Sequence, residues 1–257
     1  MKYFSLALII LGLNLFDSVL KAQEEIKLND YLEPTTKKKY SYARMLKKDK
    51  NGWGFTDRTK DGAIFQKGYF KDETMQTRVG HFIFYLDGKK LYEGENADGA
   101  PRGVWYFYKG GKLSDSLYYN EPLLKVESLK KSGANAYMVD IKTSRDPDSV
   151  TFARIEVESE FPGCQEAWRK YLNKTLQFPD IVLETMKPFS KQCVVQFIVC
   201  TDGTVCDVQA VNSVHPHLDL QAVNAIRNGP TWSPAVQDER KVKSYKKQPI
   251  VFAITEN

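Results

Sequence analysis

The last hundred residues combine two kinds of hydrophobic pattern. Two stretches carry apolar residues at helical spacing and are followed by a proline that stops a helix: 163–177 and 218–228. Three stretches alternate between apolar and polar positions, as half-buried strands do: 193–199, 205–211 and 248–255. The order helix, strand, strand, helix, strand predicts a compact α+β domain with an antiparallel sheet over residues 158–257.

A shorter pattern runs through residues 51–122, where aromatic residues alternate with glycines. The segment Gly80-His81-Phe82-Ile83-Phe84-Tyr85 is echoed by Gly103-Val104-Trp105-Tyr106-Phe107-Tyr108, and a more degenerate unit spans Gly52 to Phe70. Each unit predicts a β-hairpin with a glycine turn, such as Gly88-Lys89 or Gly111-Lys112. One hairpin cannot bury enough surface alone, so the units must stack into a sheet.

These units resemble MORN-type repeats, whose unit is a hairpin of glycines and aromatic residues. The resemblance implies an all-β module without catalytic activity. Alternate aromatic residues must face inward in such a sheet, so we expect them to form its core. A peptide- or glycan-binding face is the alternative for the same side chains.

The N-terminus predicts export of the chain. Residue Lys2 precedes an apolar run from Tyr3 to Phe16, and the small residue Ala22 follows. A run of this length is short for a membrane span but typical of a secretory signal peptide, which would be residues 1–22. An uncleaved anchor that extends to Leu20 is the alternative.

Two segments are predicted to be connectors. Residues 23–50 are polar and rich in lysine, which indicates a mobile linker with a short helix at Tyr40–Leu46. Residues 123–157 contain turn-like sequences and two short apolar stretches, 136–141 and 150–157, that predict short strands.

The four cysteines all lie in the C-terminal part: Cys164, Cys193, Cys200 and Cys206. Disulfides are expected in an exported chain, and four cysteines allow three full pairings. Cys200 and Cys206 flank the turn at Asp202-Gly203. A two-residue turn would place the two cysteines on opposite faces, whereas a three- or five-residue loop would place them on one face, so the pairing stays open.

Composition limits the functional classes. The chain of 257 residues has a net charge of +5, and its lysines are scattered rather than gathered in a dense basic face, so we expect no nucleic-acid partner. The three histidines include His215 and His217 but lie beside no acidic or thiol pattern that would hold a metal. No motif of a hydrolase, metalloprotease or nucleotide-binding loop occurs, so we expect neither an enzyme nor a cofactor.

The C-terminal domain resembles the C-terminal domain of TonB energy transducers. Six sequence pieces carry this resemblance in order: Glu160-Phe161-Pro162-Gly163, Gln177-Phe178-Pro179, Val195–Val199 with Asp202-Gly203, Leu218-Asp219 with Ala222 and Ala225, Trp232-Ser233-Pro234, and Pro249-Ile250 with Phe252. Each piece alone is weak, but together at this spacing they are specific. Asp202, Gly203 and Trp232 are expected to be structural.

The resemblance implies binding of a short extended peptide, the TonB box of an outer-membrane transporter. The physical means is the addition of a strand to an open sheet edge. Residues 248–255 are the expected edge, with Ile250, Val251, Phe252 and Ala253 as its centre. Gln177, Phe178 and Pro179 would lie near the groove, or would simply end the helix and pack on the sheet.

Localisation and partners follow from the same resemblance. We expect the periplasm or envelope of a Gram-negative bacterium after removal of the signal peptide, or an inner-membrane anchor if the N-terminus is retained. The implied partners are a TonB-dependent outer-membrane transporter and inner-membrane proton-motive-force motor proteins, in energy-coupled transport. The alternative is a non-energised envelope scaffold or adaptor whose two modules bind proteins or wall components.

Overall fold

The computed structural model describes residues 25–119, 126–132, 136–141 and 151–255. The predicted signal peptide, residues 1–22, lies outside the described residues. Within this described part of the chain, none of the helices has the length and apolarity that a bilayer crossing requires.

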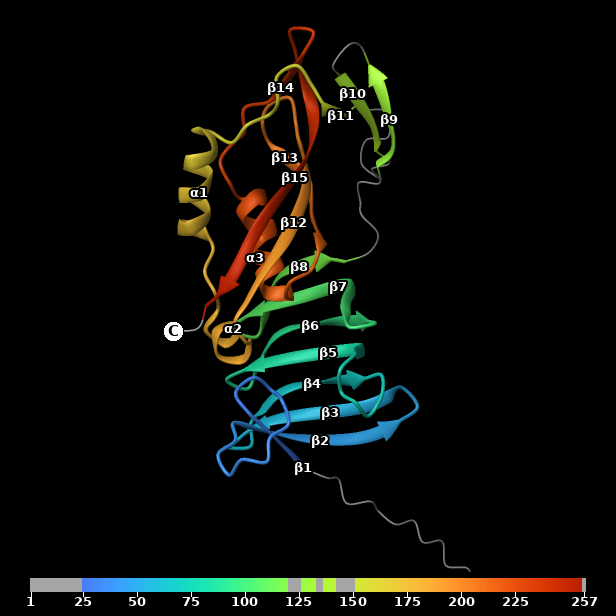
Figure 1. Ribbon diagram of the computed structural model, residues 1–257, viewed down its shortest axis with the longest axis vertical. Helices are drawn as coiled ribbons and strands as arrows, with labels where there is room; N and C mark the ends of the chain where they lie inside the picture. The colour runs from blue at the N-terminus through green and yellow to red at the C-terminus, as the bar shows by residue number, and fades with distance from the viewer. Residues whose placement is uncertain (1–24, 120–125, 133–135, 142–150, 256–257) are drawn as a thin grey trace, which may run out of the picture.

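The first half of the chain is an antiparallel meander in which each strand pairs with its neighbours in sequence (Figure 1). Its eight strands are β1 (Glu25–Leu28), β2 (Tyr42–Asp49), β3 (Gly52–Thr59), β4 (Ile64–Phe70), β5 (Arg78–Leu86), β6 (Lys89–Ala97), β7 (Ala100–Lys109) and β8 (Lys112–Tyr118). The three predicted hairpin units correspond to β3–β4, β5–β6 and β7–β8. The stacking of hairpins into one sheet is therefore confirmed.

One face of the meander is an aromatic core. Phe82 and Phe84 of β5 and Trp105 and Phe107 of β7 are buried, while the residues between them are more exposed. Gly94 makes room for this packing, because a Cβ atom there would lie 2.4 Å from the Trp105 ring. The prediction that alternate aromatic residues form the core is confirmed.

The prediction of a mobile linker with a helix at Tyr40–Leu46 is wrong, because the structure has β1 and β2 within residues 23–50. Arg44 explains the error. It occupies a core-facing position of β2, where its guanidinium bonds both carboxylate oxygens of Asp57 at 2.7 Å. A buried ion pair at this position hides the apolar alternation by which a strand is recognised in sequence.

The second half is a mixed sheet with the order β13-β12-β15-β11-β10-β9, to which β14 adds a short hairpin. Its elements are β9 (Val126–Ser132), β10 (Ala136–Ile141), β11 (Thr151–Arg154), α1 (Cys164–Thr175), α2 (Asp180–Thr185), β12 (Phe189–Val199), β13 (Val205–Asn212), α3 (Pro216–Arg227), β14 (Ala235–Gln237) and β15 (Arg240–Ile254). The predicted order of two helices and three strands is confirmed, with α2 and β14 as additions. The connector 123–157 contributes three strands to the sheet, of which β9 was not expected.

Helix α3 and the aromatic residues around α1 pack on one face of the second sheet. Phe197 of β12 packs against Trp232, which also contacts Phe161 just before α1. Helix α3 buries Leu218, Ala222 and Ile226 against the same face. The other face carries the more polar positions of the strands.

The meander and the second half share one continuous core. At their boundary the Tyr119 hydroxyl donates to the buried Asp219 carboxylate of α3 at 2.9 Å. Tyr92 of β6 and the His215 ring are 3.2 Å apart, Oη to Nε2. Figure 1 shows the meander stacked against the helical end of the second sheet, so the two halves form one packed body.

His215 should make the protein sensitive to acid. Its burial, with the nearby charges of His217 and Arg78, lowers the pKa of its ring to about 3, against 6.5 in the unfolded chain. Between these two pKa values, His215 is protonated in the unfolded chain but neutral in the folded chain. The free energy of unfolding therefore falls as pH drops. The loss is at most about 1.4 kcal/mol per pH unit.

We therefore expect the free energy of unfolding, measured with urea, to fall between pH 7 and pH 5. The variant His215→Asn keeps a residue that can cap α3 but cannot titrate, so its loss over this range should be smaller. The raised pKa of the buried Asp219 carboxyl is common to both proteins and does not enter the comparison. Equal losses in the two proteins would contradict the assignment.

Candidate functional site: the open edge of β15

Strand β15 is hydrogen-bonded along its whole C-terminal half on one side only. Its residues 244–254 pair with β12 in a continuous antiparallel register. On the opposite side β11 reaches only Lys243 and Ser244. Strand β14 pairs with residues 240–242, which precede the part of β15 that pairs with β12. Beyond Ser244, no strand of the described chain covers this edge.

The hydrogen-bond pattern of β12 shows which groups of β15 point outward. The Val194 amide donates to the Asn212 side chain of β13, so it faces away from β15. Val194 pairs with Pro249, and this pair is therefore one of those that exchange no hydrogen bonds. By alternation, the outward amides and carbonyls belong to every second residue: Tyr245, Lys247, Pro249, Val251 and Ala253.

Pro249 divides this edge without weakening the sheet. Proline has no amide hydrogen, and at an outward position none is needed for pairing with β12. Its carbonyl accepts a hydrogen bond from the Gln248 side chain at 3.2 Å. Beyond the reach of β11, the outward donors therefore lie on both sides of Pro249: Lys247 before it, and Val251 with Ala253 after it.

The side chains at the centre of the edge alternate between core and solvent. Ile250 and Phe252 are buried at 1% and 3% exposure, whereas Val251 is 63% exposed. Ala253 is exposed as well. On the exposed face of the sheet, side chains of an added strand would therefore contact Val251 and Ala253. The buried side chains of Ile250 and Phe252 would not have to move.

The segment Gln177 to Pro179 connects α1 with α2 beside the end of this strand. The Phe178 ring packs edge-on against Phe252, with ring centres 5.8 Å apart. The Gln177 amide donates to the Gln221 side chain of α3 at 2.7 Å, and the Pro179 carbonyl accepts from the first turn of α2. Phe178 is thus brought together with the edge strand, while its neighbours hold the helices.

The beginning of β15 is strongly basic. It carries Arg240, Lys241, Lys243, Lys246 and Lys247 and no acidic residue. Lys246 pairs with Glu158 at 2.7 Å. Lys247 is exposed at the open edge itself. Lysines at an edge oppose pairing with a second copy of the same strand and favour a partner of negative charge.

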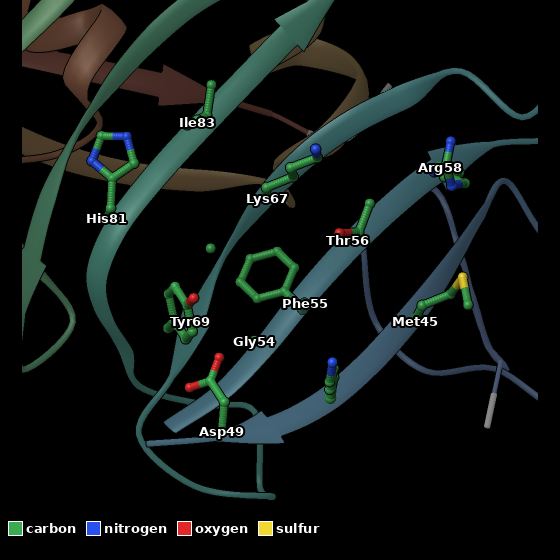
Figure 2. A pocket seen from close by; sticks show the side chains of 12 residues that line it. Met45, Asp49, Gly54, Phe55, Thr56, Arg58, Lys67, Tyr69, His81 and Ile83 are labelled. Atoms are coloured by element: carbon green, nitrogen blue, oxygen red, sulfur yellow. The ribbon is translucent and has the colours of Figure 1, made fainter. Parts of the chain in front are cut away.

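A second concave surface lies on the outer face of the meander, as Figure 2 shows. Its volume is about 560 Å³, and its wall includes Arg58, Lys67 and Tyr69. His81 lies beside it, 3.1 Å from Glu95 and 3.3 Å from Glu93.

The loop between β12 and β13 resolves the relation of Cys200 and Cys206. It spans residues 200–204, and the Cys200 amide donates to the Thr204 carbonyl. This five-residue loop places both cysteines on one face with their Sγ atoms 3.1 Å apart. Of the alternatives that the sequence left open, the one-face arrangement is confirmed.

The expectation of disulfides is not confirmed among the described residues. Cys193, Cys200 and Cys206 are thiols in the structure. Cys193 is fully buried in the core, where the Asp219 carboxyl lies beside its thiol. The side chain of Cys164 lies outside the described part.

Comparison with protein families matches residues 191–254 to the Gram-negative bacterial TonB protein C-terminal family. The match begins in β12 and ends with the last residue of β15, so it contains the open edge. It covers about a quarter of the chain and confirms the resemblance for this segment. It does not extend to the meander, whose similarity to MORN repeats stays a prediction. Neither the curated proteins nor the solved structures gave a match.

The proximity of Cys200 and Cys206 predicts the bond that forms on oxidation. Burial and the neighbouring Cys200 thiol raise the pKa of Cys206 to about 12, so the Cys206 thiol stays protonated and slow to react unaided. With oxidised glutathione as the disulfide donor, we expect one internal bond between them and two reduced glutathione molecules. Intact-mass measurement after alkylation should show it.

Two variants test the assignment. Cys200→Ser should abolish the bond, whereas Cys193→Ala should leave it unchanged. A bond that persists in Cys200→Ser would contradict the pairing.

Proposed function

We propose that this chain is a TonB-like envelope protein that binds an extended peptide of an outer-membrane transporter by strand addition to β15, as part of energy-coupled transport. The single observation that carries the proposal is the open edge of residues 245–254 within the segment that matches the TonB family. The proposed contact residues are Gln177, Phe178, Pro179, Ile250, Val251, Phe252 and Ala253.

The outward groups set the strength of this contact. Val251 and Ala253 each offer one donor and one acceptor, and Lys247 offers another pair on the far side of Pro249. Each new backbone bond contributes about 0.5–1.5 kcal/mol net, and association costs must be subtracted. The complex is therefore weak and reversible, which suits a linkage that forms and breaks repeatedly.

Charge favours one kind of peptide. The exposed Lys247 lies at the open edge, and four further basic residues precede it in β15. A peptide with an acidic residue opposite Lys247 and apolar residues opposite Val251 would match both parts of the edge. Binding should then weaken with salt, since exposed charges are screened.

An adaptor without energy coupling is the second candidate. The shared core between the meander and the TonB-like half favours it, because a transducer needs reach and this chain places a second rigid module beside the binding domain. N-terminal sequencing of protein from fractionated envelopes separates the two functions. A retained N-terminus in the inner membrane supports transduction, and a new N-terminus at Gln23 supports the adaptor.

Proline substitution at an outward position should block the peptide without unfolding the sheet. Val251→Pro removes an outward amide and places a ring at the open edge, so transporter N-terminal peptides should bind at least about tenfold more weakly. Fluorescence anisotropy with a labelled peptide measures this. The variant Val251→Ala keeps the amide and should bind almost normally.

The neighbouring position supplies the folding control. Phe252→Pro removes an inward amide that pairs with β12 and a buried ring, so it should lower the melting temperature strongly. Val251→Pro should not. Unchanged peptide affinity in a folded Val251→Pro protein would reject the edge as the binding site.

A further inference from the structure

A separate cavity lies between the meander and the helices of the TonB-like half. Its volume is about 340 Å³. Strands β2 and β4–β6 form one wall, α2 forms the facing wall, and the loop with Leu32 closes one side. The wall is mixed, with Phe70, Phe84, Ile181 and Met186 among its apolar residues. A cavity of this size that combines apolar side chains with convergent polar groups can hold a small molecule.

Arg78 supplies a positive charge to this cavity. Its guanidinium lies 4.6 Å from the centre of the Phe82 ring, and no described carboxylate forms an ion pair with it. The other arginine in the wall, Arg44, is neutralised by its two bonds to Asp57. Among the described residues, Arg78 is therefore a cationic group of this wall with which no carboxylate forms an ion pair, and its side chain is half-buried.

Tyr92 supplies a hydroxyl donor beside it. The His217 amide donates to Nδ1 of His215, so the proton of the neutral His215 ring resides on Nε2. That nitrogen lies 3.2 Å from the Tyr92 hydroxyl oxygen, which must therefore accept. The hydroxyl hydrogen of Tyr92 is left free to point elsewhere, and Tyr92 and Arg78 line the same cavity.

We propose that this cavity binds a small carboxylate with an apolar body. Its carboxylate would accept hydrogen bonds from the Arg78 guanidinium and the Tyr92 hydroxyl, and its hydrocarbon part would contact Phe84, Ile181 and Met186. The planar fork of arginine matches a carboxylate, and a single unpaired cation matches a single negative charge better than it matches a phosphate dianion. The site is distinct from the β15 edge and does not depend on the transport proposal.

The test is calorimetric titration of the full chain with benzoate and with benzamide, its neutral analogue of the same shape. We expect benzoate to bind and benzamide to bind at least tenfold more weakly. Arg78→Met should weaken benzoate binding at least tenfold, and Tyr92→Phe should weaken it less. Lys71→Met removes one positive charge from an exposed side chain and should leave benzoate binding unchanged.

A second arm identifies the source of the carboxylate. A short peptide that ends in phenylalanine is compared with the same peptide amidated at its C-terminus. Binding of the free-acid peptide would assign the site to chain ends, whereas binding of benzoate alone would assign it to free acids.

Two results would overturn the proposal. One is benzoate and benzamide binding equally or not at all. The other is an Arg78→Met variant that shows a cooperative melting transition, and so is folded, but binds benzoate as tightly as the unchanged protein. If Arg78→Met does not fold, the variant Tyr92→Phe, which keeps the buried ring, takes its place. Unchanged benzoate binding in folded Tyr92→Phe would then overturn the proposal.

Discussion

Helix α3 contacts both the second sheet and the meander, and the arrangement of the two halves depends on it. Its residues Leu218, Ala222 and Ile226 pack on the second sheet. His215, its N-cap, contacts Tyr92 in the aromatic face of the meander. Neither sheet could leave these apolar faces in water, so burial against a common helix joins the two halves into one body.

This shared packing determines which surfaces stay available. The meander covers the helical end of the second sheet, where α2 and α3 lie, and not the long edge of β15 (Figure 1). The edge is left with unpaired backbone groups, and Pro249 and the neighbouring lysines protect it from pairing with a second copy. The same packing forms the cavity with Arg78 between the halves. The open edge and this cavity thus have one structural origin.

The sequence predicted the fold best where a pattern is local. The alternation of β12 and the glycine turns of the hairpins were sufficient to place most strands. Predictions from local patterns failed where a residue distant in sequence determines the structure. Arg44 can occupy a core-facing position because Asp57 neutralises its charge. The hairpin of β14 and β15 turns at Asp238-Glu239, both with positive φ, where a glycine would have signalled it. The open edge was expected in the correct strand, but its outward residues depend on register with β12, and the cavity at Arg78 depends on packing between the halves.

Amide hydrogen exchange of the free protein, followed residue by residue by NMR, tests the open edge most directly. The inward amides of Lys246, Gln248, Ile250 and Phe252 should exchange slowly because they pair with β12. The outward amides of Lys247, Val251 and Ala253 should exchange fast and become protected when a transporter peptide is added. Uniform protection of both sets in the free protein would mean that the edge is already covered, and would contradict the account.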